Sequence, residues 1–177
     1  MDIQYLRLFY AIRVPDEIKK TLRVAFKGIS YDWKPVKEDQ MHITLAFMAD
    51  VPNTDLQLIE GVGELAAKAF PPFPITLKQT GCFPSEHKPR VWFVHTDSDI
   101  LIDLAQSLLG KLKGYGDEKP FRSHLTLARK REGTKEAPPK KEFTDTWMVK
   151  SFDLIQSTLT GTGAIHKVVR VFSLEGS

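Results

Sequence analysis

Residues 41–47 read MHITLAF, and residues 123–129, which lie 82 positions further on, read SHLTLAR. Each segment places a histidine two residues before a threonine in an otherwise aliphatic pattern. Because successive side chains of a strand point to opposite faces, the histidine and the threonine share one face and the aliphatic residues share the other. Each segment therefore predicts a strand with an apolar face for a core and a polar face that is free for chemistry.

The surroundings of the two HxT segments are also repeated. A β-rich stretch at 7–11 (RLFYA) resembles a second one at 90–94 (RVWFV), at an offset of 83. Each stretch is followed by an amphipathic helix, which the spacing of the apolar residues predicts over 15–29 and over 98–112. We interpret the recurring order of strand, helix and HxT strand as an internal duplication.

The rest of the chain adds one predicted helix and three predicted strands. The helix is expected at 54–70 and a strand at 73–78, while 151–160 and 166–174 flank a glycine turn and predict a hairpin. These elements predict an α+β fold in which residues 1–177 form a single domain of two lobes, related by an approximate two-fold axis. We expect antiparallel-rich sheets with helices on the outside and a central cleft.

Composition limits the class of protein. The chain has 177 residues and is 42% hydrophobic, which suffices for a packed core. The single cysteine, Cys82, excludes an internal disulfide, and no apolar run is long enough for a membrane span, so we expect a cytoplasmic protein without membrane contact. A formal net charge of +3 fits a phosphate-bearing ligand but not a dedicated duplex-DNA binder. A monomer is the simplest expectation.

The two polar strand faces acquire a function if the lobes face each other across the cleft. His42 and Thr44 would then converge with His124 and Thr126 on one small ligand. Because histidine titrates at about pH 6.5, one imidazole can donate a proton while the other accepts one. Hydrolysis of a phosphodiester needs both transfers, on opposite sides of an in-line phosphorus. Arg129, just past the second motif, is the candidate that clamps the phosphate oxygens.

Other interpretations apply to the same histidines. A single histidine in a strand is commonly a hydrogen-bonded structural residue, and a duplication can preserve residues by inheritance alone. Neither HxT segment has a second histidine or a carboxylate at ligand spacing, so no metal and no other cofactor is expected. We interpret His87, His95 and His166 as structural or solvated.

The ordered motifs resemble the two-histidine (2H) phosphoesterase superfamily and, within it, the RNA 2',3'-cyclic phosphodiesterases, historically called 2'-5' RNA ligases. The resemblance covers essentially the whole chain and rests on RLFYAIRVP, HITLAF, GCFP with PRVWF, HLTLAR and SFDLIQSTL, in that order. It implies a bilobal α+β fold with the two motifs on facing strands. It also implies metal-independent hydrolysis of RNA 2',3'-cyclic phosphate ends, or of cyclic nucleotides, to 2'-phosphates.

The resemblance further implies roles for individual residues. His42 would be the general acid that protonates the departing ribose O3', and His124 the general base that activates water. Thr44, Thr126 and Arg129 would bind the phosphate. Because the two halves are quasi-symmetric, the sequence leaves open which histidine is the acid and which the base.

Strand alternation conflicts with part of this assignment. Simple alternation places Phe47 and Arg129 with the leucines on the core face, so each side chain reaches the cleft only if its strand ends or bulges before it. Phe47 is therefore either a core residue or, as the resemblance implies, part of the wall that stacks on the base.

Two rival functions use the same cleft. The first is the reverse reaction, in which RNA ends are joined by a 2'-5' link, because a site that is complementary to the transition state serves both directions. The second is a non-catalytic module that binds RNA ends or nucleotides. The formation of a phosphomonoester from a 2',3'-cyclic nucleotide would distinguish them. The charged loop at 129–141 either is solvated or steers RNA.

Overall fold

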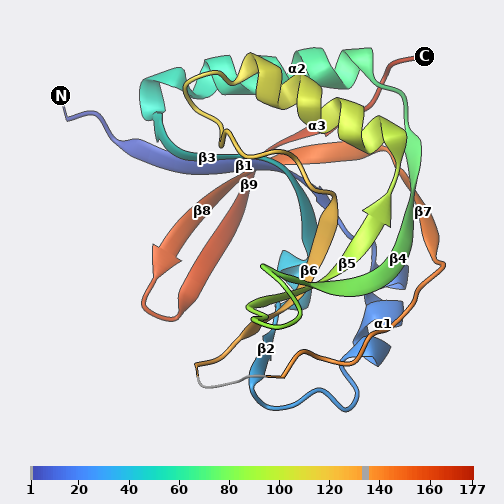
Figure 1. Ribbon diagram of the computed structural model, residues 1–177. Helices are drawn as coiled ribbons and strands as arrows, with labels where there is room; N and C mark the ends of the chain where they lie inside the picture. The colour runs from blue at the N-terminus through green and yellow to red at the C-terminus, as the bar shows by residue number, and fades with distance from the viewer. Residues whose placement is uncertain (1, 133–135) are drawn as a thin grey trace.

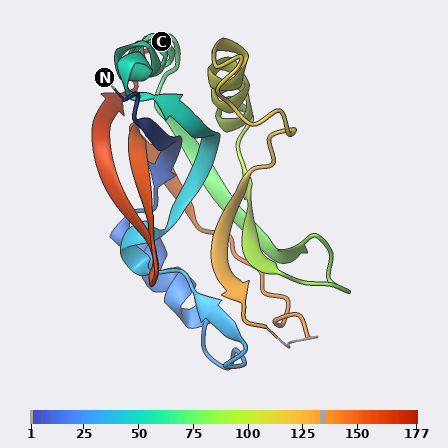
Figure 2. The ribbon, with the colours of Figure 1, turned by 90° about the vertical axis from the view of Figure 1, so that its left-hand side faces the viewer.

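The computed structural model describes residues 2–132 and 136–177, which form two antiparallel sheets and three α-helices (Figure 1). Figure 2 shows the sheets as two layers, with α2 and α3 at one end of the molecule and α1 at the other. The predicted α+β class with antiparallel sheets is confirmed. Within the described ranges, no helix is both long and apolar enough to cross a membrane.

The first sheet has the strand order β3-β1-β8-β9 and the second has the order β2-β6-β5-β4-β7. The strands of the first sheet are β1 (Tyr5–Arg13), β3 (His42–Pro52), β8 (Ser151–Thr160) and β9 (Gly163–Ser173). The strands of the second sheet are β2 (Trp33–Pro35), β4 (Phe73–Phe83), β5 (Val91–Asp97), β6 (His124–Lys130) and β7 (Thr146–Val149). Each HxT segment therefore begins a strand of a different sheet, and the predicted C-terminal hairpin is β8 and β9.

The three predicted helices are present with shifted ends. They are α1 (Asp16–Ala25), α2 (Leu56–Ala69) and α3 (Asp99–Lys111), and the short 3₁₀ turns Glu38–Gln40 and Asn53–Asp55 precede β3 and α2. The first helix ends earlier than predicted, because Gly28 has a φ of 81°, in the left-handed region that stops a helix. Helix α3 begins at Ser98, which is its N-cap, since the Ser98 hydroxyl accepts a hydrogen bond from the Leu101 amide at 3.3 Å.

The internal duplication has a constant offset of 82 in the paired strands. Arg13 lies opposite His42 in the β1–β3 ladder, and His95 lies opposite His124 in the β5–β6 ladder. The offset of 83 that was predicted for the first strands is wrong by one residue, because it aligned two arginines that do not correspond. A shift of one residue reverses the face of every side chain in a strand, so the correction matters for the cleft.

Both HxT strands carry a β-bulge at the same place. In β1–β3 the partner of Tyr10 is Ala46 and that of Ala11 is Thr44, so Leu45 has no partner. Leu45 and Ala46 are consequently both buried, and the alternation restarts one residue later. Phe47 therefore returns to the face of His42 and Thr44.

The second bulge repeats the first in β6. The partner of Trp92 is Ala128 and that of Phe93 is Thr126, which leaves Leu127 without one. Leu127 and Ala128 are both buried, and Arg129 returns to the face of His124 and Thr126. The two bulges resolve the conflict between simple alternation and the expected positions of Phe47 and Arg129.

The two halves of the chain exchange elements. The short strand β2, from the first half, pairs with β6 at the edge of the second sheet. Beside it, α1 also contacts the second half: Phe26, which follows the helix, packs edge-on against Trp92 at 5.9 Å, and Thr21 donates a hydrogen bond to Asp145 at 3.0 Å. Conversely, a residue of the second half contacts the first half: the hydroxyl of Tyr115, which follows α3, donates a hydrogen bond to the carboxylate of Asp55, which precedes α2, at 2.5 Å.

The main core lies between the apolar faces of the sheets and the helices. Its largest fully buried side chains include Tyr10, Trp92 and Phe152. The Tyr10 hydroxyl donates a hydrogen bond to the carbonyl of Ile59, which fixes α2 to β1, one of the two inner strands of the first sheet. This rigid arrangement leaves the opposite faces of β3 and β6 to form the site.

Candidate active site

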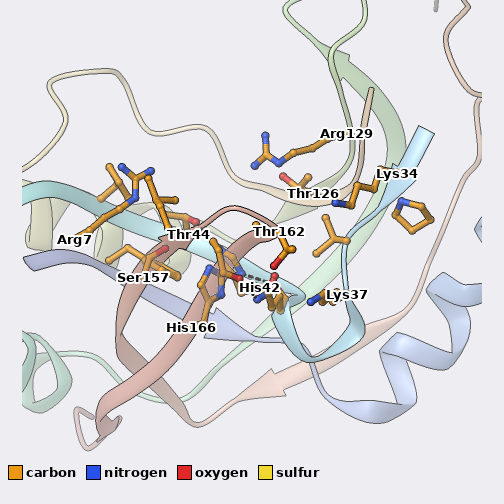
Figure 3. Close-up of a pocket in the computed structure, with 18 of the residues that line it drawn as sticks. Arg7, Lys34, Lys37, His42, Thr44, Thr126, Arg129, Ser157, Thr162 and His166 are labelled. Atoms are coloured by element: carbon orange, nitrogen blue, oxygen red, sulfur yellow. Dashed lines mark hydrogen bonds between the residues drawn. The ribbon is translucent and has the colours of Figure 1, made fainter. Parts of the chain in front are cut away.

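A cavity of about 490 Å³ lies between the cleft faces of the two sheets. Its walls come from β1, β3, β8 and β9 on one side and from β2 and β6 on the other (Figure 3). The structure brings all the sequence-predicted site residues together in this cavity: His42, Thr44, Phe47, His124, Thr126 and Arg129.

The two HxT histidines are held by equivalent hydrogen bonds. The Nδ1 atom of His42 lies 2.6 Å from the carbonyl oxygen of Gln40, and the Nδ1 atom of His124 lies 2.6 Å from that of Arg122. Because a carbonyl oxygen can only accept, each Nδ1 carries the proton and donates it. Each neutral ring therefore presents an unprotonated Nε2, the atom that is free for proton transfer.

The surroundings of the two histidines differ. The Nε2 atom of His42 lies 3.0 Å from the Thr44 hydroxyl, which can donate to it, and the His42 ring packs against Phe9 at 5.0 Å and His166 at 5.7 Å. For the Nε2 of His124, the described residues provide no hydrogen-bond partner, and its ring packs edge-on against aromatic side chains, Phe83 at 5.0 Å and Phe93 at 5.6 Å.

Burial lowers the pKa of both imidazoles. The pKa of His42 is lowered from 6.5 to about 4, first by burial and then by the nearby side chains of His166, Arg129 and His124, while the hydrogen bond to the Gln40 carbonyl acts in the opposite direction. The pKa of His124 is lowered first by burial and then by Arg129 and His95. Both rings are therefore neutral at pH 7 in the free protein, and an anion bound between them would raise both pKa values.

Four cationic side chains line the same cavity: Arg7, Lys34, Lys37 and Arg129. None of them forms an ion pair with any residue of the described ranges. The Arg7 guanidinium lies 4.4 Å from the centre of the Phe47 ring. Unpaired cations in a partly enclosed site create a positive potential that favours an anionic ligand.

Phe47 belongs to the cleft and not to the main core. Its ring is half-buried and packs against a small apolar cluster of Phe9, Ala11 and Ile155 on the cleft face of the first sheet. The ring also lines the cavity beside Arg7. Phe47 can therefore offer an aromatic surface to a ligand.

His166, which the sequence analysis interprets as structural or solvated, lies at the candidate site. It lines the cavity from β9, opposite Ser157 of β8, and packs against His42 (Figure 3). The hairpin is fixed there by Gln40, whose side-chain amide donates to the carbonyl of Ala164 at 2.8 Å. By contrast, His87 and His95 are exposed and do not line the cavity. Of the charged loop at 129–141, residues 133–135 lie outside the described residues.

The site offers donors for an anion and a pair of proton-transfer groups. In the part of the chain that the structure describes, no three His, Cys, Asp or Glu side chains cluster as metal ligands. The chemistry that these residues can perform themselves is acid–base catalysis on a small phosphorylated ligand.

Comparison with known proteins identifies the family. The description "LigT like Phosphoesterase" matches residues 12–93. The chain is 36% identical to the RNA 2',3'-cyclic phosphodiesterase of Thermus thermophilus, over 97% of this chain and 91% of that protein. The chain belongs to the LigT-like 2H phosphoesterases. Within them it falls in the RNA 2',3'-cyclic phosphodiesterase family, as the motif resemblance implies.

Solved structures of LigT-like proteins share the fold. A crystal structure of a Thermus thermophilus protein superposes with a TM-score of 0.91 at 33% identity, over 97% of this chain and 100% of that one. Escherichia coli LigT in complex with 3'-AMP superposes with a TM-score of 0.82 at 25% identity, over 97% of this chain and 99% of that one. That LigT protein therefore binds a nucleotide with a ribose phosphate.

Proposed function

We propose that this protein hydrolyses the 2',3'-cyclic phosphate ends of RNA to 2'-phosphate ends by metal-independent acid–base catalysis. The observation that carries the proposal is the pair of imidazoles in one cavity, each with Nδ1 bonded to a carbonyl and Nε2 left for proton transfer. The names of the full-length relatives support the same substrate class.

The proposed reaction is an in-line displacement. The Nε2 of His124 accepts a proton from a water molecule, whose oxygen forms a bond to phosphorus. The bond from phosphorus to O3' breaks, and His42 donates its Nε2 proton to the departing oxygen. The hydroxyls of Thr44 and Thr126 donate to the non-bridging oxygens, and Arg129 stabilises their developing negative charge. The product is a 2'-phosphate with a free 3'-hydroxyl.

The surroundings of the two rings support the assignment of acid and base. The Nε2 of His124 has no partner in residues 2–132 and 136–177, so a water molecule can approach it directly. The low pKa of His42, about 4, makes its protonated form a strong donor to an alkoxide leaving group. The negative charge of the bound cyclic phosphate raises the population of that protonated form.

The depressed pKa values predict a pH profile. In the active free enzyme one of the two histidines is also protonated at Nε2. Both pKa values lie below 6.5, so raising the pH removes that Nε2 proton. We expect a bell-shaped kcat/KM with its maximum on the acid side of about pH 6.5. The bell for kcat should lie at higher pH, because the bound anion raises both pKa values. A kcat/KM that stays constant from about pH 5 to pH 8 would contradict this expectation.

The central test uses adenosine 2',3'-cyclic phosphate in the presence of EDTA. The expected product is adenosine 2'-phosphate, identified by its retention against the 3'-isomer, at the same rate with and without the chelator. Formation of the 3'-isomer, or strict dependence on added Zn²⁺ or Mn²⁺, would reject the proposed mechanism. Binding without turnover would favour a non-catalytic module, and net joining of RNA ends in water would favour the ligase.

A further inference from the structure

The cavity extends past the histidine pair in two directions that differ in chemistry. In Figure 3, Arg7 lies on one side of His42, whereas Lys34 and Lys37 lie on the other side. The Arg7 end contains the Phe47 ring. The end with the two lysines is lined by Pro35 and Val36 as well, so its recognition groups are ammonium groups and short aliphatic side chains.

The lysine end is built by the exchanged strand β2. Lys34 pairs directly opposite Arg129 in the β2–β6 ladder, and the amide of Val36 continues the pairing by donating to the carbonyl of Leu127 at 2.8 Å. The neighbouring Trp33 is only 3% exposed and anchors the strand to the core. The lysine end is therefore a fixed part of the second sheet.

The pairing of Lys34 with Arg129 is electrostatically unfavourable by itself. Side chains directly opposite each other on one face of an antiparallel pair lie close together, and like charges in these positions repel. Neither side chain is neutralised by a carboxylate within the described ranges. Lys37 adds a third cation to the same end of the cavity. An arrangement of this kind is stabilised by an anion that lies between the cations.

A cyclic phosphate between the two histidines does not use all of these charges. In the proposed reaction it takes Arg129, together with the hydroxyls of Thr44 and Thr126. The next negative charge of an RNA strand is the phosphodiester on the 5' side of the same ribose. The base of the terminal nucleotide leaves the ribose in another direction, where the Phe47 ring and Arg7 offer a stacking surface.

We propose that Lys34 and Lys37 bind this upstream phosphodiester, so that the enzyme recognises the end of an RNA strand in preference to a free nucleoside cyclic phosphate. The inference rests on the proposed function and adds to it a binding subsite for the phosphodiester on the 5' side of the terminal nucleotide. Arg129 binds the cyclic phosphate, and the two lysines bind the phosphodiester beside it. The selectivity depends on charge alone, which predicts little dependence on the base sequence upstream.

The test compares three substrates with the same terminal adenosine. They are adenosine 2',3'-cyclic phosphate, its 5'-phosphorylated form, and the dinucleotide ApA with a 2',3'-cyclic phosphate. For the unmodified protein we expect kcat/KM for the dinucleotide to exceed that for the nucleoside by about tenfold or more, which is the usual effect of a charge-assisted contact. The kcat/KM for the 5'-phosphorylated nucleotide should also exceed that for the nucleoside.

The double variant Lys34→Ala/Lys37→Ala should remove the advantage in kcat/KM of the dinucleotide over the nucleoside. We expect its kcat/KM for the dinucleotide to fall about tenfold more than that for the nucleoside cyclic phosphate, which loses only the general positive potential of the two lysines. The dependence of KM for the dinucleotide on the salt concentration should become weaker, because a contact between opposite charges is lost. The matched control is Lys150→Ala, since Lys150 is exposed and does not line the cavity.

Three outcomes would overturn the inference. The first is equal kcat/KM for the nucleoside and the dinucleotide in the unmodified protein, and the second is an equal loss on all three substrates in the double variant. The third is a gain confined to the 5'-phosphorylated nucleotide, which would replace the RNA strand by a mononucleotide as ligand. If no substrate is turned over, the proposed function fails instead. The lysines are then tested by binding: the double variant should lose more affinity for ApA with a 3'-phosphate than for 3'-AMP, and an equal loss for both would overturn the inference.

Discussion

Replacing His42 or His124 with alanine is expected to lower kcat by about 10²- to 10⁴-fold, the usual effect of losing a general acid or base. Each Nε2 atom is the proton-transfer atom of its ring, because Nδ1 is already bonded to the carbonyl of Gln40 or Arg122. The measurement is single-turnover hydrolysis of a 2',3'-cyclic nucleotide at saturating enzyme. The double variant should lose much less than the product of the two single losses, because the two groups act in one step.

The matched control for both variants is His87→Ala. His87 lies between β4 and β5, is exposed and does not line the cavity, so its loss should leave kcat nearly unchanged. Near-normal turnover in either single variant at the HxT positions, with an unchanged circular dichroism spectrum, would remove that histidine from the mechanism.

Replacing Arg129 with alanine is expected to lower kcat by about 10²- to 10³-fold, as for the loss of a donor to the transition-state oxyanion. The change should also move the pH profile. Arg129 lowers the pKa of both His42 and His124, so its removal raises both pKa values and shifts the alkaline limb of kcat/KM to higher pH. Arg129→Lys should retain the charge but lose the two parallel hydrogen bonds to the phosphate, so its activity should lie between those of the unmodified protein and Arg129→Ala.

The matched control is Arg131→Ala, two residues further along. Arg131 is exposed, stacks on Tyr31 at 4.7 Å and does not line the cavity, so neither kcat nor the pH profile should change. A lower kcat in the Arg129 variant without a shift of the alkaline limb would mean that Arg129 only supports the local structure.

The HxT pairs could be predicted because two regularities coincide in them. The period of two in a strand places His42 with Thr44 and His124 with Thr126, and the duplication repeats the polar residues together with the aliphatic ones. The three helices were predictable for a similar reason, since each carries an apolar face of regular spacing. Regular periodicity is a local property, and the sequence displays it directly.

The cleft positions that the sequence analysis did not predict are set by breaks in the strand period and by contacts between residues far apart in the chain. The Leu45–Ala46 doublet is the signal of its bulge, because two consecutive buried residues fit no simple alternation, and the same doublet recurs at 127–128. His166 lies in a strand without an HxT motif, and it is held at the cleft by the pairing of β9 with β8 and by the hydrogen bond from the Gln40 side chain to Ala164. Lys34 lies in a strand of three residues, which is too short to show a period.

The passage of β2 and α1 into the opposite half has a consequence for how the molecule unfolds. Removing β2 would leave β6 as the exposed edge of its sheet, and removing α1 would uncover the region around Trp92. Neither repeat therefore retains a complete set of partners when the other one melts. Denaturation should proceed as one cooperative transition in which the catalytic groups of both repeats are lost together, without a half-folded species that keeps one of them.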